Sequence, residues 1–184
     1  RVKEKPAPTI TITSPSAGAY ITNTTPTIEF QVKDTDSGVN AGTIAVTVDG
    51  TAVSTVTKTA IDGGYKCTCT SPTLKDGSHT ISVKASDNDG NAAAAKTATF
   101  TVDTVPPTLQ ITAPSNGLIT NKKTVTVSGK TDDVSSKPVT VTVNGATVTV
   151  GTDGTFTKDV TLAEGANTIT IVAKDKAGKT TTVT

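Results

Sequence analysis

The feature that most constrains the fold is an internal repeat with a period of about half the chain. The segment Pro8-Thr-Ile-Thr-Ile-Thr-Ser-Pro-Ser-Ala-Gly recurs as Pro107-Thr-Leu-Gln-Ile-Thr-Ala-Pro-Ser-Asn-Gly, and Val46-Thr-Val-Asp-Gly recurs as Val141-Thr-Val-Asn-Gly. The period is close to the size of a whole domain. The repeat therefore predicts two successive copies of one fold, each with its own core, rather than a solenoid of short repeats.

Within each copy, apolar and polar side chains alternate with a period of two, which is typical of half-buried strands. Thr, Val and Ile dominate these runs, and their β-branched side chains favour strands over helices. Turn signals such as Asp76-Gly77 and Asn144-Gly145 separate the runs. About seven short antiparallel strands per copy are expected. The pattern predicts an all-β chain of two tandem immunoglobulin-like β-sandwiches.

The boundary between the copies is predicted at a joint that contains two prolines. Pro106 and Pro107 fix φ and remove backbone donors, so they end the last strand of the first copy and stiffen the connection. The predicted organisation is an N-terminal linker at 1–7, a first domain at 8–103, a Pro-Pro linker at 104–107 and a second domain at 108–184.

Several motifs resemble those of bacterial immunoglobulin-like domains, which occur in tandem on exported enzymes, S-layer-associated proteins and adhesins. The motifs of the first copy are Asp36-Ser-Gly-Val, Val48-Asp-Gly and Val102-Asp-Thr-Val-Pro-Pro. The second copy is similar to domain B of glucodextranase and carries Val143-Asn-Gly, Asp153-Gly-Thr-Phe and Ala173-Lys-Asp-Lys-Ala-Gly. Lys179 departs from that family, which often has Asn after this glycine.

The resemblance implies a non-catalytic spacer or accessory segment of a larger exported bacterial surface protein, placed extracellularly on the cell surface or secreted. Its partners would then be neighbouring domains of the same polypeptide. The alternative is an adhesion or carbohydrate/cell-wall-binding module that holds a cell-surface polysaccharide or a host protein. Sugar sites usually need exposed aromatic faces, and Phe30, Phe100 and Phe156 alternate inward, which disfavours sugar binding.

Charge and motif content argue against several other functions. The formal net charge is +1 with both signs interspersed, so we expect no nucleic-acid partner, and no apolar run of about 18 residues predicts membrane insertion. The sequence contains neither Gly-x-Ser-x-Gly nor His-Glu-x-x-His. His79 is the only histidine, and its counterpart Asn167 cannot transfer a proton, so we predict a structural or exposed role for His79 and no enzymatic activity.

Acidic residues follow the second and sixth predicted strands, whose loops emerge at the same end of such a sandwich. The first copy places Asp34, Asp36, Asp87 and Asp89 there. Asp132, Asp133 and Asp175 are the counterparts at the joint, where Asp103 is expected to join them, an arrangement that resembles the calcium joint of cadherin tandems. Carboxylates suit Ca²⁺, although Asp-Gly sequences also make simple turns. No cofactor is predicted to be required, and calcium is the candidate ligand.

Cys67 and Cys69 lie two residues apart in an alternating run, so both face the same side of a strand. A disulfide between them would be strained. We expect two small buried hydrophobic side chains, with a redox-active pair and metal binding as the alternatives.

Overall fold

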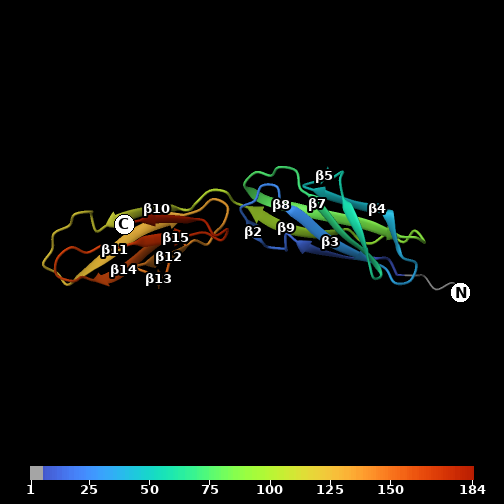
Figure 1. Ribbon diagram of the computed structural model, residues 1–184. Coiled ribbons are helices and arrows are strands. Elements are labelled where there is room, and N and C mark those ends of the chain that lie inside the picture. Colours follow the sequence, from blue (N-terminus) through green and yellow to red (C-terminus); the bar gives the residue numbers. More distant parts are fainter. Residues whose placement is uncertain (1–5) are drawn as a thin grey trace. The chain divides into compact units, whose positions relative to one another are not determined.

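The computed structural model describes residues 6–184, and residues 1–5 of the predicted N-terminal linker lie outside them. The described residues form strands and turns without a helix. The prediction of an all-β sandwich fold is confirmed. Backbone contacts divide the chain into unit 1, which ends at Asp103, and unit 2, Thr104–Thr184, next to the predicted joint (Figure 1).

Unit 1 is a sandwich of two sheets (Figure 1). One sheet has the order β1 (Thr9–Ser14), β3 (Thr27–Lys33), β7 (Gly64–Thr70) and β6 (Thr57–Ile61). The other has the order β2 (Tyr20–Ile21), β9 (Lys96–Val102), β8 (Gly77–Asp87), β4 (Val39–Val48) and β5 (Thr51–Ala52). Alternate residues of these strands point between the sheets, as Ile28, Phe30 and Val32 do on β3, and form one apolar core.

Unit 2 repeats this plan with one strand fewer in each sheet. One sheet has the order β10 (Thr108–Ala113), β11 (Thr124–Asp132) and β14 (Thr155–Thr161). The other has the order β13 (Ala146–Val148), β12 (Thr140–Val143), β15 (Ile171–Lys174) and β16 (Thr180–Val183). The second core consists mostly of valine around Phe156, and it shares no residue with the core of unit 1. Each unit therefore has the separate core that the repeat predicts.

The two cores fill equivalent space from opposite strands. In unit 1, Phe30 on β3 pairs across the sheet with the small Cys67 on β7. In unit 2 the equivalent pair is Gly129 on β11 and Phe156 on β14, so the large ring comes from the other strand. A Cβ on Gly129 would lie 2.6 Å from Phe156 Cζ. The glycine is required because the ring occupies the space above it.

One strand pair departs from the antiparallel pattern that we expected. β2 runs parallel to β9, with Tyr20 opposite Thr101 and Ile21 opposite Val102. Three backbone hydrogen bonds hold the pair: Gly18 N to Thr99 O at 2.7 Å, Thr101 N to Ala19 O at 2.8 Å, and Asp103 N to Ile21 O at 2.8 Å. An early segment of unit 1 is therefore joined directly to its last strand.

Candidate functional site

The first group of predicted cation ligands lies at one end of unit 1, where the segment after β3 meets the turn after β8. Asp34 is buried, and its Oδ1 accepts hydrogen bonds from the backbone N–H groups of Asp36, Ser37 and Gly38 at 2.9–3.0 Å. This carboxylate therefore organises its own loop, which is the common role of an aspartate that begins a turn.

Asp87 ends β8 and is 1% exposed. Its Oδ1 accepts from the backbone N of Asn91 and its Oδ2 from Asn91 Nδ2, both at 2.7 Å. Burial alone would raise the pKa of Asp87, but the hydrogen bonds from the Asn91 side chain and backbone outweigh it and lower that pKa. Asp87 is therefore ionised at neutral pH, and both of its oxygens are satisfied by one asparagine.

The four predicted ligands of unit 1 do not converge. Asp36 and Asp89 are exposed, whereas Asp34 and Asp87 are buried. Among the described residues, no three of these four carboxylates lie within 4.8 Å of one another. The sequence prediction did not include Asn91, whose backbone and side-chain amides donate to the two oxygens of Asp87.

Unit 2 has the same two turns with different partners. Asp133 Oδ1 accepts from the backbone N of Ser135 at 2.8 Å and of Ser136 at 2.7 Å, as Asp34 does in its loop. Asp175 Oδ1 accepts from the backbone N of Lys179 at 2.8 Å. Both residues are 5% exposed, and one carboxyl oxygen of each lies within 4.8 Å of the other. Two buried carboxylates therefore face each other at this end of unit 2.

The other two predicted ligands have different surroundings. Asp132 is exposed and forms a 2.6 Å salt bridge with Lys137. The hydrogen bond and charge of that lysine lower the pKa of Asp132. Asp103 closes unit 1, where its backbone N–H bonds Ile21 O. Its participation in a calcium site remains a prediction from the sequence.

His79 lies in a structural network. Its Nε2 bonds Lys75 O at 2.7 Å, and its Nδ1 bonds Asp49 Oδ2 at 2.6 Å. Burial would lower the pKa of His79, but the hydrogen bond and charge of Asp49 outweigh it and raise that pKa. In unit 2, Asn167 Nδ2 donates to Ala163 O, also four residues earlier. Both side chains therefore close the same loop.

Both cysteines are buried free thiols, Cys67 on the core side of β7 and Cys69 beside a groove. Burial raises the pKa of both thiols, and for Cys69 burial together with the neighbouring Cys67 raises it to about 11. They are therefore protonated and unreactive at neutral pH.

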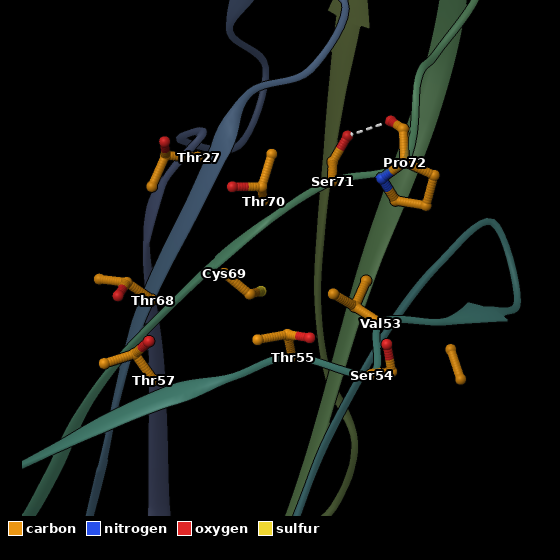
Figure 2. A pocket seen from close by; sticks show the side chains of 11 residues that line it. Thr27, Val53, Ser54, Thr55, Thr57, Thr68, Cys69, Thr70, Ser71 and Pro72 are labelled. Atoms are coloured by element: carbon orange, nitrogen blue, oxygen red, sulfur yellow. Dashed lines mark hydrogen bonds between the residues drawn. The ribbon is translucent and has the colours of Figure 1, made fainter.

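The groove beside Cys69 has a volume of about 490 Å³ and lies between β7 and the segment that joins β5 to β6. Figure 2 shows Val53, Thr55 and Cys69 around its centre and hydroxyl side chains such as Thr57 and Thr68 along its sides. No aromatic or charged side chain lines it. Such a groove offers hydroxyl groups to a ligand but no stacking surface for a sugar ring.

No helix in the described residues has the length and apolar character needed to cross a bilayer.

Two protein-family models match the chain, one in each unit. Residues 8–83 match the bacterial Ig domain, and residues 107–184 match domain B of glucodextranase.

Two individual proteins are also similar to this chain. Bacillopeptidase F of Bacillus subtilis is 32% identical over 171 residues, which is 93% of this chain but only 11% of that protein. The fibronectin(III)-like modules of Clostridium thermocellum CbhA are 19% identical, with 95% of this chain and 90% of the other covered and a TM-score of 0.55. The second similarity supports the fold alone.

Proposed function

Because the chain is a tandem of two bacterial immunoglobulin-like modules, we propose that it is a non-catalytic spacer within a larger exported bacterial protein. Its role is to set the distance between the domains on either side of it. The similarity to a short stretch of Bacillopeptidase F supports a place inside a longer chain. The protonated cysteines and the structural histidine leave no activated nucleophile or base among the groups described above.

The parallel pairing of β2 with β9 is the observation that carries this proposal. When unit 1 is pulled at its two ends, β2 and β9 move in opposite directions along their common axis. The three hydrogen bonds between Gly18, Ala19, Ile21 and the last strand are then loaded together rather than one after another. A spacer under tension needs this resistance, since forced unfolding is limited by the unfolding rate.

The experiment is single-molecule stretching of the whole chain between two handle domains. We expect two separate unfolding events, each releasing roughly 250–350 Å of contour length at ~3.3–3.6 Å per residue. Thr101→Pro removes the N–H that donates to Ala19 O and should lower the unfolding force of unit 1 only. The unit 2 event is the internal control. An unchanged unit 1 force in Thr101→Pro would show that the parallel pair does not bear the load.

The second candidate is an adhesive module, and the groove in Figure 2 is the observation that favours it. Cosedimentation of the chain with cell-wall polysaccharide tests this function. A Thr68→Val variant, which removes one hydroxyl from the groove wall, is the specific control. Binding that is lost in this variant would favour adhesion, whereas no cosedimentation favours the spacer.

A further inference from the structure

The turns at the acidic ends of the two units have the same backbone hydrogen bonds, but the residue after the glycine differs, as do the two residues before it. In unit 1, Asp87 N donates to Asn91 O at 3.1 Å, and Gly90 N donates to Asp87 O at 3.3 Å. In unit 2, Asp175 N donates to Lys179 O at 3.0 Å, and Gly178 N donates to Asp175 O at 3.3 Å. Lys179 therefore stands where unit 1 has Asn91.

This replacement leaves one carboxylate oxygen without a donor. In unit 1, the side-chain amide of Asn91 donates to Asp87 Oδ2 at 2.7 Å. Lysine cannot place a short amide in that position, and Asp175 Oδ2 is buried with no hydrogen-bond partner among the described residues. A buried carboxyl oxygen without a partner is unfavourable, which calls for a partner that the described protein groups do not supply.

The carboxyl group that carries this oxygen lies close to a second buried carboxyl group, that of Asp133. One oxygen of Asp133 and one of Asp175 lie within 4.8 Å of each other, and both residues are 5% exposed. Two ligands of one Ca²⁺ at ~2.4 Å each are at most about 4.8 Å apart, so a single ion can bridge this pair. The Oδ1 atoms are held by backbone donors, which fixes the orientation of both carboxylates.

We propose that Asp133 and Asp175 bind a hard divalent cation, Ca²⁺, in unit 2, and that Asn91 replaces this function in unit 1. Within the described residues, no salt bridge involves Asp133 or Asp175. The ion would supply the positive charge next to these two carboxylates. Backbone oxygens and water would complete its six to eight ligands. The proposal is independent of the spacer function because it concerns the stability of one module.

The experiment is a calcium titration of the chelator-treated whole chain followed by backbone amide NMR. The probes are the N–H groups of Ser135, Ser136 and Lys179, which donate to the two carboxylates. We expect these signals to shift together with a Kd on the order of 10⁻⁴–10⁻³ M, as in extracellular calcium modules. Ten millimolar Ca²⁺ should then raise the melting midpoint of unit 2 by roughly 5–20 °C. The corresponding amides of unit 1, those of Asp36, Ser37 and Asn91, should not shift.

Two substitutions of Lys179 test whether the missing side-chain amide is the reason that unit 2 binds calcium. Lys179→Asn restores the amide found in unit 1 and should weaken calcium binding at least tenfold while unit 2 stays folded. Lys179→Ala removes the same charge without supplying a donor and should bind Ca²⁺ as the wild type does. Wild-type chain that shows neither the amide shifts nor the rise in midpoint overturns the proposal. The proposal is also overturned if Lys179→Asn binds Ca²⁺ as tightly as the wild type, or if Lys179→Asn and Lys179→Ala lose calcium binding to the same extent.

Discussion

Phe156→Ala is expected to unfold unit 2 selectively. Phe156 is the only aromatic residue of that unit, and it is 3% exposed at the centre of a valine-rich core. Truncation of a buried Phe to Ala costs about 3–5 kcal/mol, and the cost increases with the cavity that remains. The opposite residue is Gly129, which has no side chain to move into that space, so we expect the upper part of this range.

This loss is large compared with the stability of the unit. A domain of about 80 residues unfolds with a free energy of ~4–12 kcal/mol. Each kcal/mol corresponds to roughly 4–8 °C in a domain of this size, so the midpoint of unit 2 should fall by at least ~12 °C. Differential scanning calorimetry measures the melting midpoints of both units. The variant Phe30→Ala identifies which transition belongs to unit 1.

Thr157→Ala is the matched control because Thr157 is the exposed neighbour of Phe156 on β14. It should change the free energy of unfolding by about 0.5 kcal/mol or less. A parallel fall of both transitions in Phe156→Ala would refute the reasoning, since it would show that the two cores do not unfold independently. A fall below ~4 °C would show that the ring does not hold the core together.

Three further predictions concern titratable side chains. Folding lowers the pKa of Asp49 and raises that of His79. The pair therefore stabilises unit 1 most at a pH between the ordinary pKa values of aspartate and histidine, at about pH 4–6.5. The melting midpoint of the wild type should therefore exceed that of His79→Asn most strongly near pH 5–6. A difference in midpoint that is equally large at pH 8 would contradict this prediction. Cys67 and Cys69 should resist a thiol reagent at pH 8 until the chain unfolds, since a pKa of about 11 leaves only roughly 0.1% of Cys69 as thiolate. Asp103→Asn should weaken calcium binding by about tenfold if the sequence prediction for the joint holds, and an unchanged Kd removes Asp103 from the ligand set.

The sequence by itself determined the repeat, the strands and the faces of the strands. Alternation with a period of two assigned Phe30, Phe100 and Phe156 to the core, and all three are buried. This works because side-chain direction in a strand depends only on local backbone geometry. The end of the sandwich at which Asp34 and Asp87 lie also followed from strand order alone.

Only the tertiary structure decided which residues meet across the sheets. The exchange of Phe30 and Cys67 for Gly129 and Phe156 depends on strand pairing, and each copy taken alone gives no sign of it. The same holds for the acidic ends, where each oxygen of Asp87 has a hydrogen-bond donor and Asp175 Oδ2 has none among the described residues. The substitution of Lys179 for asparagine was visible in the sequence. Its consequence for Asp175 depends on burial and hydrogen-bond geometry, which arise only when both loops fold against each other.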